Sequence, residues 1–309
     1  MTILYDSTIY PNSFIDLNLY NQGDWWGGSI EGNVDGPLSS LLSSSPDGNA
    51  FIAPEYNIVR NTGNVAMLSS LTRAYDTKRW FRAEVIGQNP PYNRNLPLTV
   101  SRETYWYSFS LYPLQVDFDD SIPEIIFQIH NGGTGLPAAG GEPSLPLASP
   151  GFGISIDEGE FVIQSHASPD QLPGVTTYYS ILDTLRVVPL KWYDFVIKHK
   201  IDWATPGVGD VMIWINGNLR FKQNIATGVN VSPDTYLGPY VKFGIYKRDW
   251  EDIGIVPDSS NVKTKKYIHD EIRIGDSNET YDTMKCKTPN PLLPSSNNSE
   301  MSNGSIGRF

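Results

Sequence analysis

Apolar and polar positions alternate with a period of two in one segment after another between about residues 51 and 276. Clusters of Gly, Pro, Asn and Asp separate these segments, as expected for turns between strands. The clearest predicted strands are Tyr105–Tyr112, Tyr193–Trp203 and Val211–Ile215. No segment keeps a helical period over three turns. Many short strands with few helices predict a β-sandwich or a β-barrel.

Two of these segments give more detail. Tyr193–Trp203 carries aromatic and aliphatic residues together with His199 on one face, and mostly charged residues on the other. We therefore expect His199 to be a core residue rather than a ligand. Val211–Ile215 leads into Asn216-Gly217, which is the strongest short signal for a hairpin turn, so a second strand should follow at Leu219.

The two ends of the chain are more polar. Residues 1–50 are rich in turn-forming residues and predict loops with a short strand or two. Residues 287–309 contain three prolines and a run of Ser and Asn, a composition typical of disorder. We therefore expect one domain over residues 1–286, with a loop-rich part over residues 1–50, and a disordered polar tail over residues 287–309.

The chain shows no targeting signal at its start. It lacks a basic segment followed by an apolar run, and no apolar run reaches the length that crosses a bilayer. These features predict a soluble monomer without membrane contact. We expect it to be cytoplasmic or released by lysis, and action outside the cell is also open.

The composition narrows the class of partner. The 309 residues include 23 Lys and Arg against 34 Asp and Glu, which gives a net charge of −11. General binding of nucleic acid or anionic membranes needs clustered cations and is therefore not expected. A single cysteine, Cys286, excludes an internal disulfide framework.

Three predicted strands carry an apolar face and an opposite face of chemically active groups. They are Trp80–Val85, Ile125–His130 and Tyr240–Tyr246. Ile125, Phe127 and Ile129 should face the core in the second of them. The opposite faces hold Trp80, Arg82 and Glu84 in the first strand, Gln128 and His130 in the second, and Tyr240, Lys242, Gly244 and Tyr246 in the third. If the three strands lie in one sheet, these side chains form one floor.

This set of groups suits β-elimination on a uronic-acid polymer. Removal of the weakly acidic proton beside the carboxylate requires that the carboxylate be neutralised first. Arg82 can do this with a bidentate fork, helped by the amide of Gln128. A base then takes the proton and an acid protonates the leaving glycosidic oxygen, and His130 and Tyr246 are candidates for these two roles.

The same residues carry a resemblance to a known family. Trp80-Phe-Arg-Ala-Glu84, Phe127-Gln-Ile-His130 and Tyr240-Val-Lys-Phe-Gly-Ile-Tyr246 resemble the signature strands of the concanavalin-like jelly-roll polysaccharide lyases. That group includes alginate lyases, glucuronan lyases and heparin-lyase-I-like enzymes. The resemblance covers roughly residues 70–276. It implies an all-β jelly-roll sandwich of two curved antiparallel sheets, with a substrate cleft on the concave face.

The resemblance also implies roles for single residues. Arg82 and Gln128 would bind the substrate carboxylate, and His130 and Tyr246 would share the duties of base and acid. Lys242 would be a cation at a sugar subsite. No metal or nucleotide is needed for catalysis.

Further residues are expected at the edges of the site. Glu84 should orient Arg82 rather than react. Lys247 and Arg248 follow Tyr246 and are expected at the rim of the cleft, where solvated charges are the alternative. Trp106 is expected to stack on a sugar ring, with a core position as the alternative.

Related sandwiches also suggest a structural metal. They often hold a calcium ion near the position of Asp270, so this residue is a candidate calcium ligand. The four histidines have no metal-ligand spacing, and no other metal site is expected.

The geometry of the sugar decides how the proton moves. In β-linked glucuronate or mannuronate the C5 proton and the leaving O4 lie on the same side of the ring, so that one tyrosine can act as both base and acid. In guluronate they lie on opposite sides, and His130 and Tyr246 would divide the work. We favour the first case, with Tyr246 central and a glucuronan-like substrate. The pKa of a free tyrosine, near 10, must fall for this role, and the nearby cations Arg82, Lys242 and Lys247 can lower it.

Three other functions are alternatives to this one. An alginate lyase of the same fold would need the same residues. A non-catalytic carbohydrate-binding module or lectin would keep the sandwich but has no need for Arg, Gln, His and Tyr together. A glycoside hydrolase needs two carboxylates across the scissile bond, and the pair Glu158 and Glu160 lies beside a glycine in a predicted turn.

Overall fold

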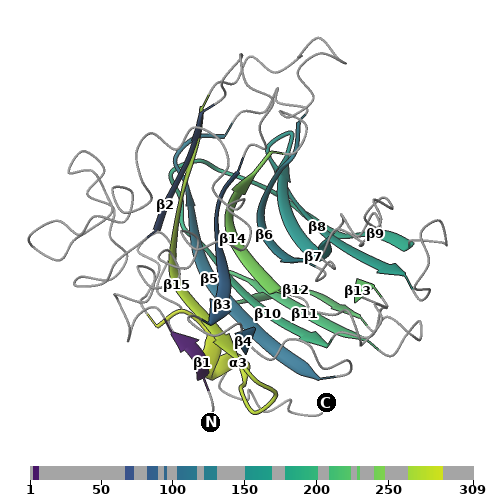
Figure 1. Ribbon diagram of the computed structural model, residues 1–309. Helices are drawn as coiled ribbons and strands as arrows, with labels where there is room; N and C mark the ends of the chain where they lie inside the picture. The colour runs from purple at the N-terminus through teal and green to yellow at the C-terminus, as the bar shows by residue number, and fades with distance from the viewer. Residues whose placement is uncertain are drawn as a thin grey trace, which may run out of the picture.

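Two β-sheets packed face to face make up the part of the chain that the computed structural model describes (Figure 1). The described residues are 3–6, 67–72, 82–89, 94–95, 103–116, 122–130, 150–168, 178–200, 209–223, 228–229, 240–247 and 264–287. Arg248, Trp80, most of residues 1–50 and residues 288–309 lie outside these ranges, and so do the predictions made for them. None of the described helices is long and apolar enough to cross a membrane.

One sheet has seven strands in its described part. Its order is β1-β15-β5-β10-β11-β12, with β2 also paired to β15. The bounds are β1 (Ile3–Asp6), β2 (Met67–Thr72), β5 (Thr104–Pro113), β10 (Tyr193–Lys200), β11 (Asp210–Ile215), β12 (Asn218–Gln223) and β15 (Thr264–Gly275). All of these pairings are antiparallel.

The other sheet has eight strands in its described part, in the order β13-β8-β7-β6-β14-β3-β4, with β9 also paired to β8. The bounds are β3 (Arg82–Asn89), β4 (Arg94–Asn95), β6 (Glu124–His130), β7 (Pro150–Asp157), β8 (Glu160–Ser168), β9 (Tyr178–Arg186), β13 (Gly228–Val229) and β14 (Tyr240–Tyr246). Only the short β13–β8 pair is parallel among the described pairings. The strands β3, β14 and β6 are neighbours (Figure 1), which places the three motif strands in one sheet.

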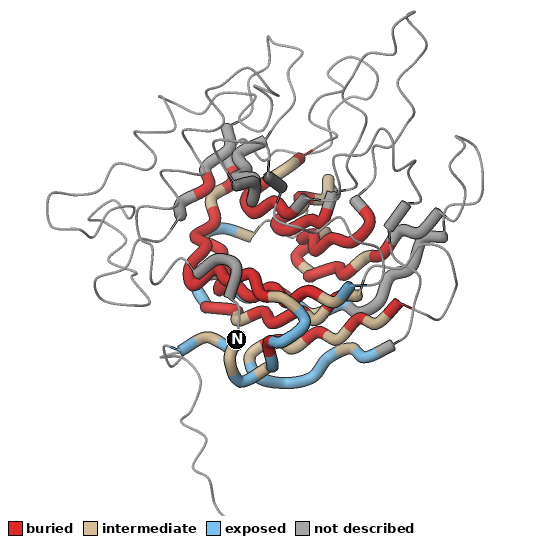
Figure 2. Tube along the Cα trace, turned by 60° about the horizontal axis from the view of Figure 1, so that its bottom comes forward, coloured by how far each residue is buried: buried red, intermediate tan, exposed pale blue. Residues whose placement is uncertain are grey.

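The predicted alternation is visible in the burial of each strand. In β10, Phe195, Ile197 and His199 are buried, whereas Lys198 and Lys200 are partly exposed. Figure 2 shows the buried segments gathered in the middle of the described strands. We call the face of each sheet that meets the other sheet its inner face, and the opposite face its outer face. The expectation that His199 belongs to the core is confirmed.

Aromatic rings fill the space between the two sheets. Phe109 of β5 lies at the centre, with its ring centroid 4.8 Å from that of Phe195 and 5.3 Å from that of Phe127. Phe127 in turn lies 5.1 Å from Phe243 of β14. Such pairs add to the free energy gained by apolar burial, at about 0.5–1.5 kcal/mol each. The motif strands β6 and β14 are therefore held from behind by a packed aromatic core.

The hairpin between β11 and β12 has the predicted turn. Asn216 and Gly217 have φ angles of 51° and 80°, so both central residues adopt the left-handed region that a two-residue type I′ turn requires. The side chain of Asn216 also accepts a hydrogen bond of 2.9 Å from the backbone N–H of Asp194 in β10. The prediction from Asn216-Gly217 is confirmed.

Two irregularities interrupt the motif strands. Between Ile125 and Phe127, β6 has one residue more than β7, and between Phe243 and Tyr246, β14 has one residue more than β6. Because of the extra residue, Ile126 is buried in the core and Ile125 is only partly buried. The prediction that Ile125 faces the core is therefore wrong, since a bulge shifts the alternation by one position.

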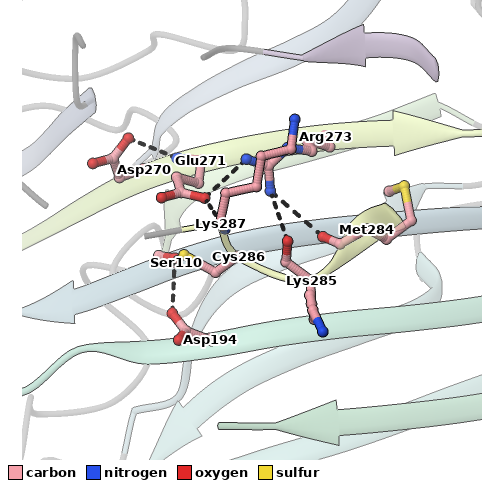
Figure 3. A network of polar contacts seen from close by, with 9 residues as sticks. All are labelled: Ser110, Asp194, Asp270, Glu271, Arg273, Met284, Lys285, Cys286 and Lys287. Carbon is pink, nitrogen blue, oxygen red and sulfur yellow. Dashed lines mark hydrogen bonds and ion pairs between the residues drawn. The ribbon is translucent and has the colours of Figure 1, made fainter. Parts of the chain in front are cut away.

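A short C-terminal segment covers the outer face of the seven-stranded sheet. The single-turn helix α3 (Tyr281–Met284) begins with a capping box between Thr280 and Thr283. Figure 3 shows Arg273 of β15, which is fully buried, donating to the carbonyl oxygens of Met284 at 3.5 Å and Lys285 at 3.3 Å. The same guanidinium forms an ion pair of 2.8 Å with Glu271. One buried arginine thus holds the segment on the sheet.

Candidate active site

The backbone register decides which motif residues meet. The strand β14 lies between β3 and β6, and it pairs with both of them antiparallel. Opposite residues in such a pair share a face of the sheet. In this register Tyr240 lies opposite His130, Lys242 opposite Gln128, Gly244 opposite Glu84 and Tyr246 opposite Arg82. The outer face of β14 is therefore flanked by candidate residues along its whole length.

The row through Lys242 is the best described part of this face. Lys242 lies opposite Gln128, and Gln128 lies opposite Gly153 of β7. Gly153 in turn lies opposite Gln164 of β8, whose amide nitrogen donates to Ser155 at 3.2 Å. Only 2% of Lys242 and 1% of Gln128 is exposed. A lysine and a glutamine thus occupy opposite positions in a largely desolvated row.

Such a row is suited to a carboxylate. Electrostatic attraction between an ammonium group and an anion is stronger where water is excluded. Amide N–H groups add hydrogen bonds to carboxylate oxygens. The row of Lys242 and Gln128 can therefore bind and neutralise one acidic group.

The next row toward the end of β6 holds His130 opposite Tyr240. These are the two residue types used for proton transfer, and they occupy the positions next to the Lys242–Gln128 row on the same face. A carboxylate-binding row beside a His–Tyr row is the arrangement that proton abstraction next to a carboxylate needs.

Tyr246 lies elsewhere. It is six residues from Tyr240 along β14, which corresponds to about 20 Å along an extended strand. The register places it opposite Arg82 and Ile125. The register therefore places Tyr240, and not Tyr246, opposite His130. The catalytic role expected of Tyr246 stays a prediction that the register does not test. The sequence showed that both tyrosines share one face, but the offset between antiparallel strands is set by tertiary pairing and cannot be read from either strand alone.

Lys247 does not lie at a solvated rim. It follows Tyr246, so the alternation turns its side chain to the inner face, and the side chain is fully buried. Its ammonium group donates to the Glu124 carboxylate at 2.7 Å and to the carbonyl oxygen of Ile122 at 2.6 Å. The prediction that Lys247 contacts substrate is corrected: the residue is part of the interior.

Trp106 is also placed away from the motif strands. It lies in β5 of the other sheet, where 6% of it is exposed. Its ring is stacked on that of Trp214 with centroids 5.9 Å apart, and it belongs to a buried cluster with Val196 and Met284. The expectation of sugar stacking by Trp106 is corrected to a packing role on the outer face of the seven-stranded sheet, where α3 covers it.

The residues around Asp270 do not fit a calcium site in the described part of the chain. Asp270 is buried, and one of its carboxylate oxygens accepts a hydrogen bond of 2.6 Å from the N–H of Glu271 (Figure 3). The Glu271 carboxylate is occupied by Arg273 and by the N–H of Lys287. Among the described residues no group of three His, Cys, Asp or Glu side chains is arranged to hold a metal ion. A calcium ion bound by Asp270 stays a prediction that these contacts do not support.

Two core histidines are neutral and take no part in this face. Burial lowers the pKa of His199 to about 3, and it lowers that of His269 to about 4. His199 packs on the ring of Phe152 at 5.1 Å, and neither of its nitrogens has a hydrogen-bond partner among the described residues. His269 contacts the carbonyl oxygen of Ile126 at 3.2 Å. Both belong to the interior of the sandwich.

Comparisons with known proteins bear on the family and the fold of this chain. A family model described as polysaccharide lyase matches residues 25–273. The chain is similar in structure to an endo-β-1,4-glucuronan lyase from the fungus Trichoderma reesei, with a TM-score of 0.54, 18% sequence identity, and coverage of 72% of this chain and 85% of that chain. It is also similar to the family 7 alginate lyase A1-II′, with a TM-score of 0.41, 16% identity, and coverage of 74% and 86%. No curated protein sequence matches the chain. The jelly-roll sandwich is thereby confirmed.

Proposed function

We propose that this chain, which belongs to the polysaccharide lyase family and is therefore a carbon–oxygen lyase, cleaves a uronic-acid polymer by β-elimination. The proposed substrate is β-1,4-linked and of the glucuronan type. The observation that carries the proposal is the pair of adjacent rows on the outer face of the eight-stranded sheet. One row holds Lys242 and Gln128, and the next holds Tyr240 and His130. The fold shared with a glucuronan lyase supports the choice of substrate class.

The first row prepares the substrate. Lys242 and Gln128 bind the carboxylate of the uronic acid on the far side of the bond that breaks. Neutralising this carboxylate stabilises the charge that develops when the neighbouring C5 proton is removed. The family resemblance assigns Arg82 to the same carboxylate, but Arg82 lies opposite Tyr246, about 13 Å along the strand from the row of Lys242. In this proposal Arg82 binds a neighbouring sugar unit.

The second row moves the proton. A phenolate at Tyr240 takes the C5 proton, and the electron pair of that bond forms the C4–C5 double bond. The bond between C4 and the glycosidic oxygen breaks, and the leaving oxygen receives the proton from Tyr240. His130 holds the carboxylate or the phenolate in place. One residue can do both steps because the proton and the leaving oxygen lie on the same side of a β-linked glucuronate ring.

Two matched substitutions test the assignment. Tyr240→Phe and Tyr246→Phe each remove one hydroxyl group from the same face of the same strand. We expect Tyr240→Phe to lower kcat on glucuronan by about a hundredfold or more, the usual range for loss of a general acid–base group. Tyr246→Phe should keep kcat within a few-fold. The release of unsaturated product, followed by its ultraviolet absorbance, measures both.

The opposite ranking would restore Tyr246 as the proton carrier. Loss of activity in both variants with unchanged melting temperatures would mean that the two tyrosines act together. Activity on alginate but not on glucuronan would leave the assignment of the two rows unchanged. It would show that the substrate is alginate and not glucuronan.

A further inference from the structure

A buried ion pair on the inner face of the sheet joins β6 and β14, the two central strands of the candidate site. The ammonium group of Lys247 lies 2.7 Å from a carboxylate oxygen of Glu124, and neither side chain is more than 2% exposed. A second ammonium group, that of Lys265, lies 3.3 Å from the other oxygen of Glu124. The hydroxyl of Tyr267 donates to the same carboxylate. Lys265 and Tyr267 come from β15, so the cluster also ties the two sheets together.

The position of this pair in the strand register is specific. Glu124 is the first residue of β6, and Lys247 directly follows the last residue of β14. Tyr246 lies opposite Ile125, so Glu124 and Lys247 are the next positions of the same antiparallel pair. The ion pair is therefore a contact across the strands, placed on the inner face at one end of β6 and β14.

The strands between this end and the candidate rows are irregular. Both β6 and β14 have an extra residue between the ion pair and the row of Gln128 and Lys242. The extra residue of β14 falls between Phe243 and Tyr246, where Gly244 has a φ angle of 142°, which favours glycine. The packing of Phe127 against Phe109 and Phe243 specifies the register next to the candidate rows, and the bulge lies between that packing and the end of the strands where the ion pair is.

A slip of one residue would be costly for function. Side chains alternate between the faces of a strand, so a one-residue shift of β6 against β14 moves Gln128 and His130 out of line with Lys242 and Tyr240. The same shift would separate the carboxylate of Glu124 from the ammonium group of Lys247. A buried ammonium group that loses its carboxylate partner is strongly destabilising, and this disfavours the slipped pairing.

We propose that the Glu124–Lys247 ion pair sets the register of β6 against β14 and so positions the Lys242–Gln128 and Tyr240–His130 rows. Buried ion pairs contribute little net stability compared with apolar residues, and fixing a register is their best supported use. The kinetic part of this inference rests on the proposed lyase function. The structural part does not.

Glu124→Gln and Lys247→Met test the inference, and Glu271→Gln is the matched control. The control breaks another buried carboxylate–cation pair, that of Glu271 and Arg273, whose two partners lie in the same strand and cannot hold two strands in register. We expect all three variants to have a lower melting temperature than the wild-type protein. Only Glu124→Gln and Lys247→Met should lower kcat, by about a hundredfold, which is the loss that a displacement of about 1 Å can cause at a reacting group.

A second measurement reports the register without using activity. Ile129 and Val241 lie opposite each other on the inner face, and neither belongs to the candidate rows. Opposite Cα atoms in antiparallel strands are about 4.5–5.5 Å apart, a distance that a disulfide can bridge. The double substitution Ile129→Cys with Val241→Cys, in a Cys286→Ser background without other thiols, should therefore form a disulfide on mild oxidation. Mass spectrometry gives the yield.

The inference predicts that the disulfide yield falls when Glu124→Gln or Lys247→Met is added, and that it is unchanged with Glu271→Gln. An unchanged yield in all backgrounds would overturn it, whatever the activity. If Glu124→Gln does not fold, Lys247→Met carries the test, because Glu124 then keeps Lys265 and Tyr267 as partners. Failure of both variants to fold, while the control folds, would also overturn it, since the pair would then be a requirement of folding. A wild-type protein without lyase activity would defeat the proposed function and leave the disulfide test intact.

Discussion

At the scale of single residues, the side chains that carry charge or protons are divided between two environments. Lys242 and Lys247 are separated by five positions of one short segment, yet Lys242 lies on the outer face beside Gln128, and Lys247 lies on the inner face with Glu124. Alternation along β14 accounts for both. From the sequence both lysines were expected to contact substrate, because a residue just beyond the end of a predicted strand has no clear face.

His199 shows what the interior does to a titratable group. Its pKa is lowered from 6.5 to about 3 by burial, and that of His269 is lowered to about 4. Unfolded chains therefore bind more protons than the folded protein at pH values below about 6.5. The stabilising effect of keeping both histidines neutral is complete above that pH and is lost as the pH falls.

The expected result is a loss of about 2 kcal/mol of unfolding free energy for each histidine between pH 7 and pH 5. Urea unfolding at the two pH values measures it. His199→Leu removes one of the two titrations, so the difference between the two pH values should shrink by about half. An equal difference in the variant and the wild type would contradict this account of His199.

At the scale of strands, most of the architecture could be predicted from the sequence, but the offsets between paired strands could not. The boundaries of β14 match the predicted Tyr240–Tyr246, and the turn at Asn216-Gly217 is as expected. These features follow from local alternation and from turn chemistry. The bulges in β6 and β14 arise where two strands with unequal numbers of residues must bury the same apolar faces. These bulges set the offset between β6 and β14 that places His130 opposite Tyr240. The sequence of one strand alone does not determine this offset.

The turn between β11 and β12 offers a direct test of the local argument. Gly217 has a φ of 80°, and a Cβ added there would lie 3.5 Å from the Tyr281 hydroxyl, an ordinary contact. Gly217→Ala should therefore cost only the strain of a left-handed alanine, about 1 kcal/mol of unfolding free energy. Thermal unfolding measures this cost. Activity should be unchanged because the turn belongs to the sheet without the candidate rows, and a loss of kcat would show that this sheet contributes to the site.

At the scale of the whole molecule, the chain has a net charge of −11 and yet belongs to a family that acts on polysaccharides. A polyuronate substrate would be repelled at long range, so the binding free energy must come from short-range contacts in the two rows. The burial of Lys247 removes one of the cations that the sequence analysis counted toward substrate binding. Of the cations that were expected at the site, Lys242 and Arg82 remain on the described outer face, with Arg82 placed opposite Tyr246.

The central claim is that these rows support β-elimination on a β-linked uronic-acid polymer. The most direct measurement is ultraviolet absorbance of the unsaturated product during incubation of the full chain with glucuronan, alginate, heparin and hyaluronan. We expect a rise in absorbance with glucuronan that Tyr240→Phe abolishes. No rise with any of the four polymers, from protein shown to be folded, would contradict it.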